Sequence, residues 1–160
     1  MPVGFSHFLP MRKQLLRLLI ALLPFAGAAF FSSSCGTARR VTEQSSVQML
    51  CDWVWTFSQT HPEGFTVDVR TMAEPIEGIS VAYAETQNSF SRDSLLRVVS
   101  HSLSHDGFVG GWRDDATGLY YFDSVRLFPE DSLQAALTFA RENAQLAVFV
   151  ISKGEEIVLE

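Results

Sequence analysis

Two histidines four residues apart have the spacing of a metal-binding pair. His101 and His105, followed by Asp106, fall on one face of a predicted helix, where two imidazoles can share a zinc ion. Counting about 100° per residue from Leu95, the two histidines lie at about 240° and 280°. The apolar arc, at about 40° to 100°, is formed by Leu96, Val99 and Leu103. We therefore expect the pair on the solvent side of the helix and, with no third ligand nearby, predict neither a metal site nor a cofactor.

One acidic residue lies inside a strand-like segment. Alternation along Tyr120–Ser124 places Asp123 on the same strand face as Tyr121. A carboxylate that points inward there needs a cationic partner, such as Arg70 or Arg113. Asp123 is thus a candidate catalytic residue, as are the two histidines. The alternatives are a structural ion pair and a solvent-facing side chain.

Two further segments are candidates for ligand binding. Gln87 and Asn88 belong to a run of four hydrogen-bonding side chains, 86–89, that follows a predicted strand. Such runs more often build turns and helix caps by bonding to their own backbone. Trp112 follows two glycines, where a ligand could approach the backbone closely, although a bend beside a packed tryptophan explains the pattern equally well.

Hydrophobic periodicity predicts three helices, at 46–59, from Ser91 or Asp93 to Gly107, and after Glu130. Period-two or continuous apolar runs predict six strands: 65–69, 79–83, 109–112, 119–128, 146–151 and a last one ending at Leu159. The order α-β-β-α-β-β-α-β-β favours an α+β fold with a mostly antiparallel sheet and helices on one face. The continuously apolar run 146–151 indicates a central strand that is buried on both faces.

The N-terminal segment is typical of a bacterial export signal. Arg12, Lys13 and Arg17 precede an apolar run of 14 residues, 18–31, which is shorter than the roughly 20 residues of a membrane span and within the range of a cleaved signal peptide. We assign residues 1–34 to the signal peptide, with Met11 as an alternative start. We therefore expect the rest of the chain to act outside the cytoplasm.

Cys35 directly follows the small residues that end this signal. The arrangement resembles the lipobox of bacterial lipoprotein precursors, although Ser32 stands where leucine is usual. The resemblance implies a lipid on Cys35, a tether over 35–45 and a globular domain over 46–160, held at the cell-envelope membrane. The alternatives are an ordinary signal peptide, which leaves Cys35 as a thiol, and an uncleaved anchor helix. Cys51 is either a buried free thiol or, if Cys35 is not lipidated, its disulfide partner.

Nine basic and 18 acidic residues follow the apolar run, so the exported part carries a net charge of −9. A surface of this sign repels nucleic-acid phosphates. We therefore expect no nucleic-acid partner, and membrane contact through the lipid anchor alone.

Several segments together resemble an uncharacterised small domain of bacterial mobile elements and prophages. They are 64–71, 78–83, 86–90, 110–112, 120–125 and 139–143. The resemblance covers about residues 61–160. It implies a domain boundary but no activity, and the exported leader departs from the cytoplasmic copies of that pattern.

The hypothesis from sequence is a non-enzymatic binding module at the cell envelope, with an unknown protein or small molecule as its partner. The alternative is a small hydrolase- or nuclease-like effector enzyme built on a polar cluster around His101 and Asp123. Convergence of these side chains in one concave pocket would favour the enzyme.

Overall fold

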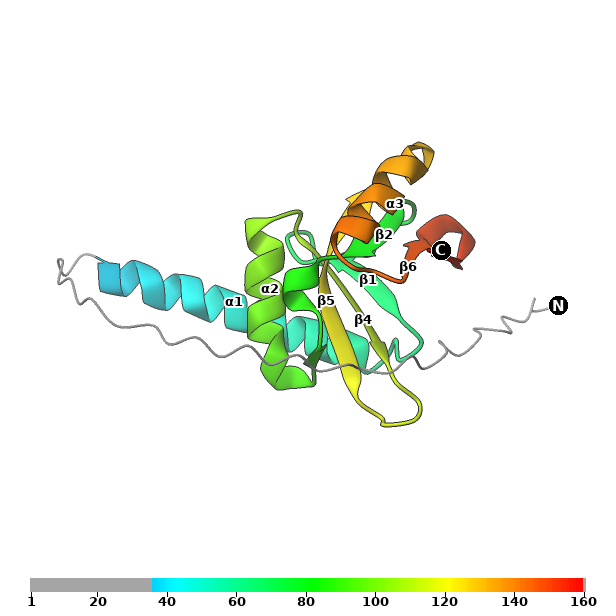
Figure 1. Cartoon of the computed structure of the whole chain (residues 1–160). Helices are drawn as coiled ribbons and strands as arrows, with labels where there is room; N and C mark the ends of the chain where they lie inside the picture. Colours follow the sequence, from blue (N-terminus) through cyan, green and yellow to red (C-terminus); the bar gives the residue numbers. More distant parts are fainter. Residues whose placement is uncertain (1–35, 160) are drawn as a thin grey trace, which may run out of the picture.

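The computed structural model describes residues 36–159, with side chains from Gln44 onward. Its three α-helices and seven strands form an α+β fold, as predicted (Figure 1). The helices are α1 (Gly36–Ser58), α2 (Leu95–Ser104) and α3 (Leu133–Glu142). The strands are β1 (Phe65–Asp68), β2 (Ile79–Ala82), β3 (Ser89–Phe90), β4 (Phe108–Arg113), β5 (Tyr120–Phe128), β6 (Ala147–Val150) and β7 (Glu155–Val158).

The strands form one antiparallel sheet in the order β1-β4-β5-β2-β6-β7, and the short β3, which was not predicted, pairs with β5. The strands predicted at 109–112 and 119–128 pair as β4 and β5, and in this pair Gly110 is opposite Asp123 and Trp112 is opposite Tyr121. Strand β6 was predicted to be the central strand, but this was wrong: it lies second from the edge of the sheet. Only Val148 and Val150, on one face of β6, are buried. The apolar run also includes Leu146, which is 71 % exposed, so the run did not indicate burial on both faces.

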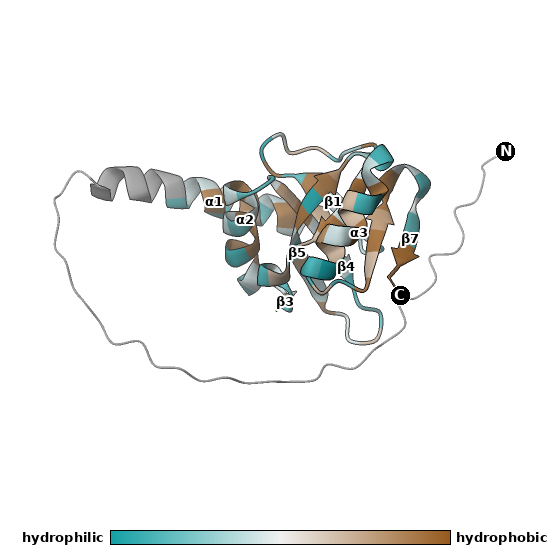
Figure 2. Ribbon diagram, turned by 45° about the horizontal axis from the view of Figure 1, so that its top comes forward, coloured by the Kyte–Doolittle hydropathy of each residue, from teal (hydrophilic) through white to brown (hydrophobic). Residues whose placement is uncertain are grey.

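All three helices cover the same face of the sheet. Two groups of buried side chains mark this face, one under α1 and α2 and one under α3. The β5 side chains that belong to these groups, Tyr120, Phe122 and Phe128, alternate with Tyr121, Asp123 and Leu127 on the opposite face. In Figure 2 the strands beside α3 are largely brown, whereas the helices carry both teal and brown residues. The opposite face of β5 therefore has no helix over it among the described residues.

The sheet curls toward its helix-free face. Thr66 on β1 and Ser80 on β2 lie within hydrogen-bond distance, with 3.3 Å between their hydroxyl oxygens, although β4 and β5 lie between those strands in the sheet. In a flat sheet, strands three places apart are separated by roughly 14 Å. Both side chains lie on the helix-free face, because Thr66 is opposite Gly110 and Ser80 is opposite Leu127 in the strand register. The helix-free face is thus concave, with the Thr66 and Ser80 side chains meeting across it, and we call this concave face the trough.

The first helix begins at Gly36, ten residues before the predicted start at Ser46, so it extends into the stretch predicted as a tether. Its buried side includes Cys51, which is a free thiol with 3 % exposure, as predicted for an unpaired cysteine. Cys35 and the signal segment lie outside the described residues. None of the helices in residues 36–159 has both the length and the hydropathy that a bilayer span requires.

The buried side of α2 differs from the predicted one. Leu96 is 47 % exposed, while Val98 and Ser102 are fully buried with Leu95 and Val99. The prediction placed the apolar arc on the side of Leu96. The helix is rotated away from it because it packs against α1 as well as against the sheet. Neither Ser91 nor Asp93, predicted at the start of this helix, caps it, since α2 follows a 3-10 turn at Arg92–Ser94 and has no side-chain cap, whereas Gly107 ends it as predicted, with φ of 88°.

Candidate binding face and histidine cluster

Three aromatic side chains stand in a row on the helix-free face, and we call Phe90, Tyr121 and Trp112 the aromatic strip. They come from the adjacent strands β3, β5 and β4, where Phe90 and Trp112 are both in register with Tyr121. The rings of Trp112 and Tyr121 are stacked, with centroids 4.9 Å apart and planes 10° apart. The Phe90 ring meets Tyr121 edge-on at 5.5 Å. Phe90 is 44 % exposed, so the strip is accessible from the trough.

Asp123 lies next to this strip, inside the trough. It is two residues from Tyr121 on β5, and its partner on β4 is Gly110, which has no side chain. Its Oδ1 atom is buried and has no hydrogen-bond partner. Burial raises the pKa of this carboxyl from 3.8 to about 7, and the positive charge of Arg97 partly opposes the shift. Asp123 is therefore a half-buried acid without a bonded cation.

The arginines predicted to pair with Asp123 lie elsewhere, so this prediction was wrong. Arg70 donates to the carbonyl groups of Leu103, His105 and Asp106, where it caps the C-terminal end of α2. Arg113 approaches Asp115, with 3.7 Å between Nη2 and Oδ1.

The cation that acts on Asp123 is Arg97 of α2, which the sequence analysis did not single out. Its Nη2 donates to the carbonyl oxygens of Thr86 and Gln87, at 3.3 and 3.1 Å, and to the hydroxyl of Ser89. It thereby fixes the loop between β2 and β3 and makes no hydrogen bond to Asp123.

The two histidines form a second group with Tyr83 and Asp106, which we call the Tyr83 cluster. The Tyr83 hydroxyl donates to Asp106 Oδ2. The imidazole rings stack on each other, with centroids 3.9 Å apart, and the Tyr83 ring lies 5.1 and 5.0 Å from those of His101 and His105. Burial and the hydrogen bond to Asp106 raise the pKa of Tyr83 to about 12.

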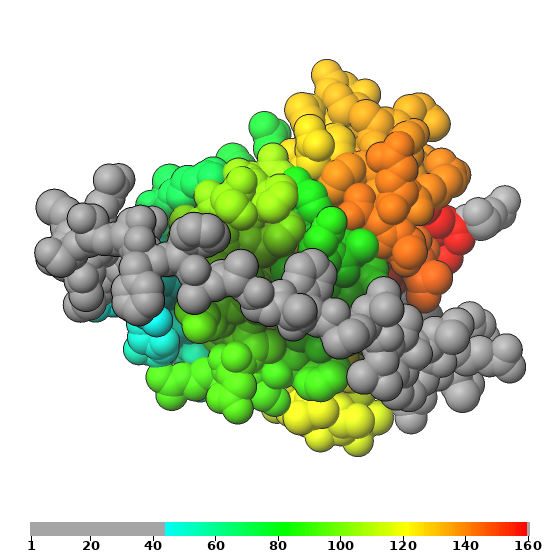
Figure 3. Space-filling model, turned by 60° about the vertical axis from the view of Figure 1, so that its left-hand side comes forward, coloured from blue at the N-terminus to red at the C-terminus, as the bar shows by residue number. Residues whose placement is uncertain are grey.

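The prediction that the histidine pair is on the solvent side was wrong for His101. This residue is half-buried, and its Nδ1 is enclosed without a hydrogen-bond partner. Burial, followed by the charge of His105, lowers the pKa of His101. His105 is exposed, and its Nδ1 donates to the carbonyl of His101 at 2.8 Å. In Figure 3, α2 in yellow-green and α3 in orange lie on either side of the green segment that follows β2, and Tyr83 belongs to that junction.

The structure does not bring His101 and Asp123 into one site. Helix α2, which carries His101, packs on the Phe122 face of β5, whereas Asp123 points to the opposite face. Among the described residues, no group of three or more histidine, cysteine, aspartate or glutamate side chains could hold a metal ion.

Gln87 and Asn88 have structural contacts of the turn-building kind. The Gln87 side-chain amide donates to the carbonyl of Asn143 at 3.0 Å, and Asn88 is exposed in a left-handed conformation with φ of 60°. Asn143, which the sequence analysis missed, accepts from the backbone amide of Ala84 at 3.0 Å. Its position just after α3 marked it only as a helix-capping residue. These contacts join the β2–β3 loop to α3.

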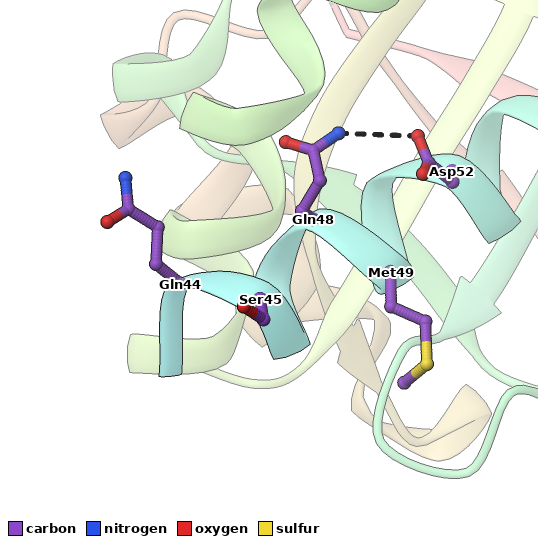
Figure 4. Close-up of a pocket in the computed structure, with 5 residues that line it drawn as sticks. All are labelled: Gln44, Ser45, Gln48, Met49 and Asp52. Carbon is purple, nitrogen blue, oxygen red and sulfur yellow. Dashed lines mark hydrogen bonds between the residues drawn. The ribbon is translucent and has the colours of Figure 1, made fainter. Parts of the chain in front are cut away.

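The surface of α1 has a shallow depression, shown in Figure 4. Its lining residues are Gln44, Ser45, Gln48, Met49 and Asp52. All come from α1, and the Gln48 amide donates to Asp52 Oδ1 at 3.3 Å. Asp52 also forms an ion pair of 2.5 Å with Arg92, which lowers the pKa of its carboxyl group. The depression is thus the outer surface of one helix and contains none of the predicted site residues.

Comparison of the chain with protein-family models, with curated proteins and with solved structures gave no match.

Proposed function

We propose that the domain is a ligand-binding module and that it binds its ligand in the trough on the helix-free face. The observation that supports this most directly is the aromatic strip on three adjacent strands, next to Asp123. Stacked aromatic side chains offer a large contact area at little cost in conformational entropy. A few polar groups beside such a surface fix the orientation of a ligand.

The enzyme hypothesis has less support. A hydrolase or nuclease built on His101 and Asp123 needs both groups at one reacting atom. His101 is on α2, which covers one face of the sheet, whereas Asp123 lies on the opposite face. The side-chain amide of Gln87 donates to the carbonyl of Asn143. The net charge of −9 on the residues that follow the apolar run also opposes the approach of a nucleic acid.

The binding face is tested by a ligand-observed NMR screen of amines, alcohols, sugars, carboxylates and short peptides. We expect hits whose binding is lost in Trp112→Ala and retained in Met49→Ala, a matched loss of an apolar side chain on α1. Circular dichroism and thermal melting establish that both variants fold, with Trp112→Phe as the milder replacement. Hits that survive in Trp112→Ala but not in Met49→Ala would transfer the function to the α1 surface.

We further propose that this module is exported and held at the cell-envelope membrane by a lipid on Cys35. The basic residues, the short apolar run and the small residues before Cys35 support this location. The test is the intact mass of the protein from the membrane fraction, compared with Cys35→Ala. A diacylglycerol adduct that disappears in the variant supports the anchor, and an unmodified soluble product contradicts it.

A further inference from the structure

The trough contains a hydrogen-bond acceptor for which none of the described residues supplies a donor. Buried polar atoms in folded proteins nearly always have a partner, and leaving one unpaired costs roughly 1–3 kcal/mol. Asp123 Oδ1 is such an atom, although the residue as a whole is only half-buried. Because Oδ1 itself is enclosed, a ligand can meet this carboxyl group only through the exposed part of the half-buried side chain, where its charge acts on the whole carboxylate.

Within residues 36–159, no cationic group is bonded to Asp123. Gly110 on β4, Thr66 on β1 and Ser80 on β2 are uncharged. Farther along β1, the Asp68 carboxylate accepts from the backbone amide of Arg70 at 2.8 Å. Arg97, on α2, acts on Asp123 through its charge while its guanidinium is bonded to the β2–β3 loop.

We infer that the trough selects ligands with a primary ammonium group, such as an alkylamine or a lysine side chain, and that this group binds to Asp123. The inference rests on the binding function proposed above. An ammonium group supplies up to three donors and, unlike a neutral hydroxyl, compensates the charge of a buried carboxylate. The net charge of −9 on the residues that follow the apolar run attracts cations and repels anionic ligands.

The aromatic strip suits the rest of such a ligand. An alkyl stem that leads away from the ammonium group can lie along Tyr121 and Trp112, as lysine stems do on apolar surfaces. Aromatic rings within about 6 Å of a cation also attract it. The carboxyl group and the rings are close enough for one ligand, because Tyr121 and Asp123 are separated by one residue on the same strand face.

The experiment compares n-butylammonium with n-butanol, which has the same length but no charge. Affinities are measured by NMR titration at pH 6 and pH 8 on the wild type, on Asp123→Asn and on Asp115→Asn, whose carboxylate is 90 % exposed. We expect n-butylammonium to bind more tightly than n-butanol, and to lose at least tenfold in affinity in Asp123→Asn but not in Asp115→Asn. Because the cation prefers the ionised carboxylate and the Asp123 pKa is about 7, binding should be about tenfold tighter at pH 8 than at pH 6.

Equal affinity for both probes, or unchanged n-butylammonium binding in Asp123→Asn, would overturn the inference. If n-butanol or a screened sugar still depends on Trp112, the binding face itself stands and only the ammonium selectivity fails. If no probe or screened compound depends on Trp112, both proposals fail together.

Discussion

Replacing Asp123 by asparagine removes a charge that the folded protein accommodates poorly. The pKa of this carboxyl is 3.8 without the fold and about 7 within it, so the folded state binds the proton more tightly than the unfolded state does. Below about pH 4 the carboxyl group is protonated in both states and does not reduce the free energy of unfolding. As the pH rises through about 7, the free energy of unfolding falls, because the folded state disfavours the ionised carboxylate. At about 1.4 kcal/mol per pKa unit, the full loss is about 4 kcal/mol, of which about 2.5 kcal/mol develops between pH 5 and pH 8.

Urea denaturation at pH 5, 6, 7 and 8 measures this effect. The free energy of unfolding of Asp123→Asn minus that of the wild type should increase by about 2.5 kcal/mol across this range. The control is Asp115→Asn, which makes the same substitution at a carboxylate that is 90 % exposed. A pH-independent difference for Asp123→Asn would refute the reasoning and mean that the carboxylate is solvated in the folded protein.

Three further predictions concern the core and the Tyr83 cluster. Gly111→Ala should destabilise the domain by about 2 kcal/mol in thermal or urea unfolding, since the added Cβ would lie 2.8 Å from the Phe65 ring. A variant without the other cysteine should show no reaction of Cys51 with a thiol reagent until it unfolds, because burial raises the pKa of this thiol to about 11; rapid labelling of the native protein would contradict the buried position. Tyr83→Phe should lower the free energy of unfolding by roughly 1.5–3 kcal/mol through loss of the hydrogen bond to Asp106, and an unchanged value would mean that the bond contributes nothing.

Local periodicity was sufficient to predict the fold class and most of the elements. The strands predicted at 109–112 and 119–128 and the helix predicted after Glu130 are confirmed, because the buried sides of those segments are also their most apolar sides. The position of 146–151 within the sheet was wrong, since an apolar run does not specify how many strands lie beyond it. The rotation of α2 was wrong because Leu96, although apolar, faces away from both α1 and the sheet.

The candidate site could be predicted only in part. The sequence singled out Asp123 and Trp112 as candidates, and the alternation along β5 placed Asp123 on the same strand face as Tyr121, as the structure shows. Phe90 could not be added from the sequence, because it joins the aromatic strip through the pairing of a two-residue strand. The burial of Asp123 also depends on the curl that brings Thr66 to Ser80, a long-range property that no local pattern contains.

The most direct test of the binding face uses the three tryptophans as internal reporters. Trp53 and Trp55 lie on α1 under the opposite face of the sheet, and Trp112 belongs to the aromatic strip. In a titration with n-butylammonium, followed through the indole N–H signals, we predict a saturable shift of the Trp112 signal with little change in the other two. Shifts at Trp53 or Trp55 with a stationary Trp112 signal would contradict binding in the trough.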